Sequence, residues 1–243
     1  MGESKKPKKI KDMIRGAPFY ATARTIFHQL RMGLLSNKSD VSEKGEFTFL
    51  NKLVSAEFPK FIVDVGAGDG IVGSNSYNFI KSGWNAIVIE PNPYLFRLLL
   101  QRYKHNKRVI CVNKACSNKT GCMELFLGKT ISTGTLCRDE NDWFKENRMD
   151  KSIVVQLDTL TNILVDNKYM KDFSILLIDA EGMDYEVLLS LNFTLFQPKI
   201  ILTEEYLWNK QKHDDKYRLL KDNGYILKEV IGSNAIWVKN YTS

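Results

Sequence analysis

The stretch Phe61-Ile-Val-Asp-Val-Gly-Ala-Gly-Asp-Gly70 decides the fold of this chain. It opens with an apolar run typical of a buried strand, which one acid, Asp64, interrupts. Glycines then follow at alternate positions up to Gly70, so the backbone can turn sharply and approach a ligand closely. Twenty residues after Gly70, a second apolar run ends in another acid, Glu90. A strand, a glycine turn, a helix and an acid-tipped second strand predict half of a nucleoside-binding α/β fold.

Apolar strands and amphipathic helices continue to alternate along the rest of the chain. Strands are expected at 86–90, 109–113, 174–179 and 199–204, with helices at 75–82, 93–104, 158–168, 183–191 and 213–222. This alternation predicts a doubly wound, mostly parallel sheet covered on both faces. Two further strands, 225–231 and 235–239, join at Gly232-Ser-Asn234 and predict a terminal β-hairpin.

Two segments do not fit this alternation. Apolar runs at 121–127 and 151–157 predict strands around a polar loop, 128–150, and loops of this length often bind substrate or act as lids. Before the first strand, helical spacing predicts helices within 18–35 and 46–58. We therefore expect three regions, which are a disordered basic tail at 1–12, N-terminal helices at 13–58, and a ligand-binding domain at 59–243.

The positive charge is confined to the N-terminal part of the chain. Residues 1–38 hold nine Lys/Arg and two Asp/Glu, which accounts for the net charge of +7, and the remainder is neutral. The basic tail is interpreted as a solvated arm, or as a peripheral contact to an anionic membrane surface. Nucleic acid is not an expected partner, because the neutral remainder lacks a basic, aromatic face.

Segments that would direct the chain out of the cytoplasm are not apparent. The N-terminus has no apolar signal core, and no apolar stretch reaches the length of a membrane-spanning helix. The four cysteines, Cys111, Cys116, Cys122 and Cys137, show neither CxxC nor zinc spacing. These features predict a reduced, cytoplasmic protein that contacts membranes at most through its tail.

The details of the glycine run favour one nucleoside over another. A nicotinamide dinucleotide fingerprint would place its third glycine at position 71, which is Ile71. Asp64 is poorly placed beside a pyrophosphate but suits a cationic ligand, and S-adenosylmethionine carries a sulfonium and an α-amino group. Glu90 can accept hydrogen bonds from ribose hydroxyls. Both acids favour S-adenosylmethionine, and a nicotinamide oxidoreductase is a distant alternative.

A series of motifs in the same order resembles the FkbM-type S-adenosylmethionine-dependent methyltransferases. They lie between about residues 60 and 206 and comprise Asp64–Gly70, Ser74-Asn75, Gly83-Trp84, Ile89-Glu-Pro-Asn-Pro93, Asn113-Lys-Ala-Cys-Ser117 with Gly121, Leu157-Asp-Thr-Leu160, Ile178-Asp-Ala-Glu-Gly182 and Glu186-Val-Leu188. The resemblance implies a Rossmann-like class I methyltransferase fold with a seven-stranded sheet. It also implies methyl transfer to a hydroxyl, often on a sugar or natural product. The family is broad, so the acceptor itself is not implied.

The strand ends supply the residues expected at the cofactor. Glu90 and Asn92 are expected at the ribose, and Ala115 at the adenine. The methionine part is expected to lie among residues of the first strand and glycine turn, with Asp179 from a later strand: Asp64, Gly66, Ala67, Gly68 and Asp69. Asp69 has an alternative role as a turn or helix cap.

Methylation of an alcohol requires removal of its proton, so a base or a metal ion is expected. The candidate catalytic residues follow the last parallel strands: Asp179, Glu181, Glu204 and His213. If Mg²⁺ is bound, Asp179 and Glu204 are its expected ligands, because hard cations prefer oxygen. A cofactor contact or helix cap for Asp179, and a helix cap for Glu181, remain alternatives.

Together these features predict an S-adenosylmethionine-dependent O-methyltransferase that acts on a sugar, a glycan or a related small metabolite. The N-terminal helices and loop 128–150 are expected to cover the acceptor. Alternatives are an N- or carboxyl-methyltransferase on the same fold, or a non-catalytic protein that retains the fold. The oligomeric state is not predicted.

Overall fold

The computed structural model describes residues 37–128, 134–136, 148–168, 173–205 and 209–241. The chain divides into two units, Met1–Ser39 and Asp40–Ser243, and the architecture below is that of the second unit. The expected basic tail at 1–12 and the expected helix at 18–35 lie outside the described residues.

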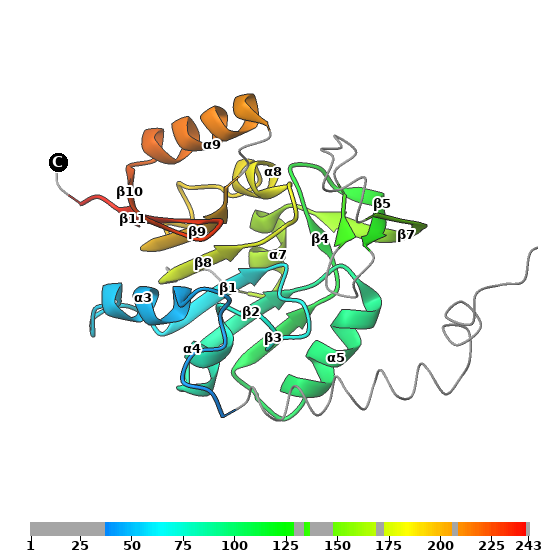
Figure 1. The fold of residues 1–243 in the computed structure, drawn as a ribbon, viewed down its shortest axis with the longest axis horizontal. Coiled ribbons are helices and arrows are strands. Elements are labelled where there is room, and N and C mark those ends of the chain that lie inside the picture. The colour runs from blue at the N-terminus through cyan, green and yellow to red at the C-terminus, as the bar shows by residue number, and fades with distance from the viewer. Residues whose placement is uncertain (1–36, 129–133, 137–147, 169–172, 206–208, 242–243) are drawn as a thin grey trace, which may run out of the picture. The chain divides into compact units, whose positions relative to one another are not determined.

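A seven-stranded sheet forms the centre of this unit, in the order β10-β11-β9-β8-β1-β2-β3 (Figure 1). Its strands are β1 (Phe61–Val65), β2 (Asn85–Ile89), β3 (Val109–Val112), β8 (Ile175–Ile178), β9 (Ile200–Glu204), β10 (Tyr225–Ile231) and β11 (Asn234–Lys239). The first five pair in parallel, whereas β11 runs antiparallel to both β9 and β10. The predicted α/β class and the terminal hairpin are therefore confirmed.

Among the described residues, three helices pack on each face of the sheet. Along β1, Ile62 packs in a cluster with residues of α3 (Glu46–Leu53), α4 (Tyr77–Lys81) and α5 (Pro93–Tyr103). The next residue, Val63, packs with residues of α7 (Leu160–Asp166), α8 (Asp184–Leu189) and α9 (Lys210–Asp222). Both faces of the central strands are thus buried, which explains why their sequences are continuous apolar runs rather than alternating ones.

The helix boundaries follow from capping residues in the sequence. Asn92 accepts a hydrogen bond from the Tyr94 N–H at the start of α5, and Pro93 occupies the first helical position. Thr159 and Asn209 cap α7 and α9 in the same way. Helix α3 is shorter than predicted, because Val54 already has an extended backbone.

A second, four-stranded sheet has the order β4-β7-β5-β6. Its strands are β4 (Ala115–Cys116), β5 (Gly121–Gly128), β6 (Gly134–Thr135) and β7 (Arg148–Asp158). The sequence predicted β5 and β7 but not the two-residue strands β4 and β6. Strand β6 lies inside the expected loop 128–150, of which 129–133 and 137–147 are outside the described residues. Leu125 and Leu136 pack with Met183, which brings this sheet against the segment after β8.

None of the helices in the described ranges is long and apolar enough to cross a membrane.

Candidate cofactor and acceptor site

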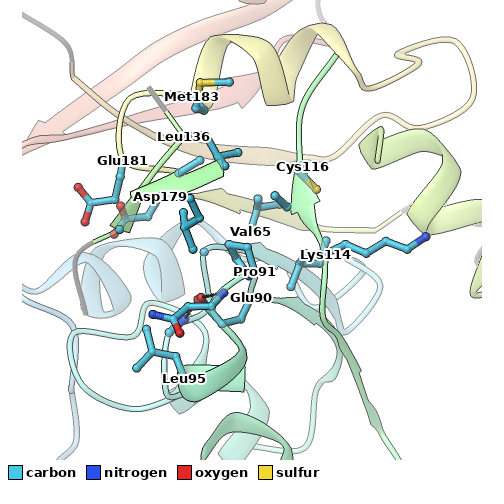
Figure 2. Close-up of a pocket in the computed structure, with 18 residues that line it drawn as sticks. Val65, Glu90, Pro91, Leu95, Lys114, Cys116, Leu136, Asp179, Glu181 and Met183 are labelled. Atoms are coloured by element: carbon cyan, nitrogen blue, oxygen red, sulfur yellow. Dashed lines mark hydrogen bonds between the residues drawn. The ribbon is translucent and has the colours of Figure 1, made fainter. Parts of the chain in front are cut away.

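A cavity opens at the carboxyl ends of β1, β2 and β8, where ligands of doubly wound sheets bind (Figure 2). It encloses about 660 Å³ of empty space, part of it open to solvent. The lining includes seven residues expected from the sequence, which are Gly66, Gly68, Glu90, Asn92, Ala115, Asp179 and Glu181. Apolar side chains complete it, among them Ile89, Leu95, Leu125, Leu136 and Met183.

Glycine is required at position 66 because two strand ends meet there. Gly66 has φ of 87°, and a Cβ added to it would lie 1.8 Å from the backbone oxygen of Asp179. The Gly66 N–H donates to the Ile89 oxygen at 2.9 Å. Gly68 differs, because a Cβ there would meet no atom of the described residues within 4 Å. The first glycine therefore lets β1 approach β8, whereas the second exposes backbone to the cavity.

Three residues of the glycine run do not line the cavity within the described structure. Asp64 is buried in β1 and accepts a hydrogen bond from the Ser76 hydroxyl, and burial raises its pKa to about 6. Ala67 packs in the core on the α3–α5 side of the sheet. The Asp69 carboxylate accepts from the N–H groups of the two residues that follow Gly70, at 2.9 Å each. For Asp69, the turn-capping alternative describes the observed contacts.

Glu90 is held by the backbone on both of its carboxylate oxygens. One oxygen accepts from the Gly68 N–H and the other from the Asn92 N–H, each at 2.8 Å. Each oxygen has a second lone pair for a ligand hydroxyl. Burial raises the pKa of Glu90 to about 7, with smaller contributions from Asp64 and Asp69. This carboxylate is held in place by the backbone, and its role at the ribose stays a prediction.

Asn92 and Ala115 both line the cavity, Asn92 beside Glu90 and Ala115 in β4 of the second sheet. The Asn92 side-chain oxygen is already used as the cap of α5. Lys114 also lines the cavity, although the sequence did not single it out, and its ammonium pairs with Asp158 at 2.7 Å. In Figure 2 the Lys114 side chain points away from Asp179 and Glu181.

Asp179 and Glu181 form the acidic side of the cavity, in the segment between β8 and α8 (Figure 2). Asp179 is exposed where it faces the cavity. The surrounding protein and the carboxylates of Glu181 and Glu204 raise its pKa well above the usual range. Burial, together with Asp184 and Glu43, raises the pKa of Glu181 to about 7. The Glu181 carboxyl group can therefore take up a proton near neutral pH.

The backbone of this segment is strained at Glu181, and a residue of the second sheet forms a hydrogen bond with it. Glu181 has φ of 49°, a left-handed conformation that costs a non-glycine residue on the order of 1 kcal/mol. Its carbonyl oxygen accepts a hydrogen bond of 2.7 Å from the Thr135 hydroxyl on β6. The second sheet thus contacts the acidic segment directly.

Glu204 ends β9 and is not among the cavity-lining residues in the described ranges. Its N–H donates to Asp184 Oδ2 at 2.7 Å, and its carbonyl accepts from the Lys216 ammonium. Its Oε2 is buried and has no hydrogen-bond partner among the residues described. Burial, Asp184 and Glu181 raise the pKa of Glu204 to about 8. The structure therefore places Glu204 near the acidic segment but outside the cavity wall.

His213 lies on α9 and is likewise absent from the described cavity wall. Its Nε2 is 2.9 Å from Glu205 Oε2, and its ring stacks on Tyr217 with 4.2 Å between centroids. These contacts indicate a structural role.

The expected metal site gains no support. No three His, Cys, Asp or Glu residues of the described ranges are grouped as metal ligands. Asp179 and Glu204 are therefore not part of a three-ligand metal site within that part of the chain.

Sequence reasoning missed Asp184, which connects the elements of the acidic side. The buried Asp184 carboxylate accepts from the Ala180 N–H at 3.0 Å and from the Glu204 N–H at 2.7 Å. It thereby joins the segment after β8 to the end of β9. An acid two residues after Gly182, at the start of a predicted helix, was the available signal.

The cavity fits S-adenosylmethionine on three observations. Backbone is exposed without a side chain at Gly68, and Glu90 offers fixed acceptor oxygens. The apolar lining suits an adenine ring. The acidic side, with Asp179, suits a cationic group.

Solved structures of similar fold include methyltransferases. A protein from Staphylococcus aureus assigned as a caffeoyl-CoA O-methyltransferase is 13% identical, with a TM-score of 0.51 over 91% of this chain and 100% of that chain. A methyltransferase from Geobacter sulfurreducens is 14% identical, with a TM-score of 0.47 over 93% of this chain and 91% of that chain. The first of these likenesses supports the class I methyltransferase fold. A search of curated proteins found no match.

The family comparison covers most of the chain. The family model described as the methyltransferase FkbM domain matches residues 64–227, from the first strand to the terminal hairpin. This range includes the glycine run, Glu90, the acidic segment after β8 and the end of β9. The resemblance stated from the motifs is thereby confirmed, and the chain belongs to the FkbM methyltransferase family.

Proposed function

We propose that this chain transfers a methyl group from S-adenosylmethionine to a hydroxyl group of a sugar, a glycan or a related small metabolite. The observation that carries the proposal is the pair of cavity-lining carboxyls, Asp179 and Glu181, with raised pKa values at the end of β8. Bound S-adenosylmethionine supplies the electrophilic methyl group. The chain's own residues bind the cofactor, orient the acceptor and remove the proton from its hydroxyl group.

Binding rests on the glycine turn and Glu90. The carboxylate of Glu90 accepts ribose hydroxyls on the lone pairs that the Gly68 and Asn92 N–H groups leave free. Ala115, Leu95 and Leu125 provide an apolar surface for the adenine. The cavity orients the reacting groups, and orientation supplies much of the rate in a single displacement.

The carboxylates of the acidic side, Asp179 and Glu181, remove the proton from the acceptor hydroxyl. A general base is most effective when its pKa is near the working pH, and burial brings the pKa of Glu181 to about 7. Asp179 shares this environment and is exposed to the cavity. Either carboxylate can accept the hydroxyl proton while the new bond forms, and the proton then leaves to solvent.

The charge of the acidic side argues against a carboxylate acceptor. The carboxylate of Asp184 contributes to the raised pKa values of Asp179, Glu181 and Glu204, so several acidic groups lie close together on this side. Lys114, the basic side chain on the described wall, is paired with Asp158. An anionic acceptor would meet repulsion there, whereas a neutral polyol would find acceptors for its hydroxyls.

The test begins with calorimetry of S-adenosylhomocysteine, followed by methyl transfer from labelled S-adenosylmethionine. The acceptors are three glycosides that differ at one position: a hexose, the corresponding uronic acid and the amino sugar. They distinguish a hydroxyl, a carboxyl and an amine as the methyl acceptor. A wider set of glycans is then tested. We expect label on the neutral hexose type. Label on the amine or carboxyl alone would replace O-methylation with the corresponding alternative, and absence of cofactor binding would refute the methyltransferase proposal.

Variants then separate binding from chemistry. Glu181→Gln is expected to keep cofactor affinity and lower kcat by about 100-fold, the usual effect of losing a general base. The matched control is Glu229→Gln on β10, an exposed glutamate at the edge of the sheet. If Glu181→Gln and Asp179→Asn both retain full turnover, these carboxylates are not the base.

A further inference from the structure

Helix α5 contacts the glycine turn through the side chains of its last two residues. Arg102 Nε donates to the backbone oxygen of Asp69 at 3.0 Å. The Tyr103 hydroxyl donates to the backbone oxygen of Gly70 at 3.1 Å. Two consecutive carbonyl groups of the turn are therefore hydrogen-bonded to one helix. Neither side chain lines the cavity.

Close packing accompanies these hydrogen bonds. Gly70 has φ of 77°, and a Cβ added there would lie 2.7 Å from Leu99 Cδ1 and 3.0 Å from Tyr103 Cε2. Tyr103 is 7% exposed, and burial raises its pKa, so its hydroxyl stays protonated and remains a donor. The turn and the helix thus touch directly, with glycine required at the contact.

The first turn of the same helix reaches the other side of the cavity. Asn92 caps α5 and donates its N–H to Glu90, and Leu95 lines the wall. Helix α5 therefore borders the ribose-binding side at its start and holds the glycine turn at its end. A displacement of either part would alter the distance between Gly68 and Glu90.

We propose that Tyr103 and Arg102 are positioning residues for the cofactor. By holding the carbonyl oxygens of Gly70 and Asp69, they keep the turn in the conformation in which the Gly68 N–H meets Glu90. The proposal rests on the proposed function, in which this turn binds S-adenosylmethionine. Without these bonds the turn samples other conformations, and the measured affinity falls in proportion to the fraction that remains competent to bind.

Tyr103→Phe removes the hydroxyl and keeps the ring. We expect the affinity for S-adenosylhomocysteine, measured by calorimetry at 25 °C, to fall about tenfold, which corresponds to about 1.4 kcal/mol. The matched control is Tyr225→Phe, because the Tyr225 hydroxyl is also buried and donates to a backbone oxygen, that of Pro198, at 2.8 Å. That bond lies before β9, at the sheet edge opposite the cavity. Both variants should lose thermal stability, but only Tyr103→Phe should lose affinity.

Arg102→Met tests the same proposal through the less buried member of the pair. It keeps the aliphatic part of the side chain, and we expect a smaller loss of affinity, about threefold. Arg97→Met, an exposed position on the same helix, is its control and should bind as the wild type does. If Tyr103→Phe does not fold, the affinities of Arg102→Met and its control Arg97→Met test the proposal on their own.

The outcomes distinguish this inference from the proposed function. A wild-type protein that binds no S-adenosylhomocysteine refutes both. A wild-type protein that binds, with Tyr103→Phe and Arg102→Met binding equally well, overturns the positioning role alone. An equal loss of affinity in Tyr225→Phe would also overturn it, because the effect would then be a general loss of stability.

Discussion

Alanine at the first two glycines of the turn should produce two different defects. Gly66→Ala should mainly lower the stability of the fold, whereas Gly68→Ala should mainly lower the affinity for the cofactor. In Gly66→Ala, the new methyl group would lie 1.8 Å from the Asp179 oxygen, whereas real contacts of this kind are at least 3.0 Å. The ends of β1 and β8 must therefore separate, which disturbs the hydrogen bond from the Asp179 N–H to the Val65 oxygen. Overpacking of this kind costs about 1–3 kcal/mol, and the left-handed backbone adds about 1–2 kcal/mol. We expect a loss of about 2–5 kcal/mol of unfolding free energy.

Gly68→Ala carries the backbone cost without the collision. Its φ is 58°, and the methyl group meets no atom of the described residues within 4 Å, so the expected loss of stability is about 1–2 kcal/mol. The methyl group would instead stand at the cavity wall, where the cofactor approaches the backbone. We expect affinity for S-adenosylhomocysteine to fall by at least about tenfold in a protein that remains well folded.

Urea unfolding followed by circular dichroism gives the two stabilities, and calorimetry gives the affinities. The reasoning predicts that Gly66→Ala is less stable than Gly68→Ala by about 1–3 kcal/mol, which is the cost of the overpacking. Equal stabilities for the two variants would refute the close approach of β1 and β8. Wild-type affinity in Gly68→Ala would refute the place given to the cofactor.

Two further predictions concern titration and the helix α9 histidine. Because the Glu90 pKa is about 7 and its ionised form accepts both ribose hydroxyls, affinity for S-adenosylhomocysteine should rise with pH. It should be about tenfold weaker at pH 6 than at its plateau, and calorimetry of Glu90→Gln should show a flat profile. The raised pKa also means that the ligand-free protein loses stability as pH rises through about 7, which a thermal melt series would detect. His213→Ala should keep turnover within about twofold and lose about 1 kcal/mol of stability; a 100-fold loss of kcat would instead indicate the base.

The sequence predicted the parts of the fold that depend on local pattern. The glycine run identified β1, its turn and the position of Glu90, because a buried strand and a left-handed turn each leave a local signature. The strands and helices of the large sheet were found within a few residues of their observed ends. The two-residue strands β4 and β6 were missed, since a strand so short has no periodicity to detect.

Side-chain direction at the strand ends could not be predicted in the same way. Asp64, Glu90 and Glu204 all looked like cavity residues, because each is an acid near the end of a strand. Asp64 lies one residue before the end of β1 and accepts a hydrogen bond from Ser76. Glu90 follows β2, and its carboxylate accepts hydrogen bonds from two backbone N–H groups at the cavity. Asp184 was missed because its partners, Ala180 and Glu204, are brought together only by the pairing of β8 with β9.

The two backbone hydrogen bonds to Glu90 have a consequence for the thermodynamics of binding. The carboxylate, the Gly68 turn and the start of α5 are already joined in the ligand-free protein, so little chain remains to be ordered when the cofactor enters. Binding should therefore show a heat-capacity change that matches the apolar surface of the ligand alone, without a contribution from coupled folding. Preorganisation of this kind also avoids the entropic penalty that flexible sites incur on association.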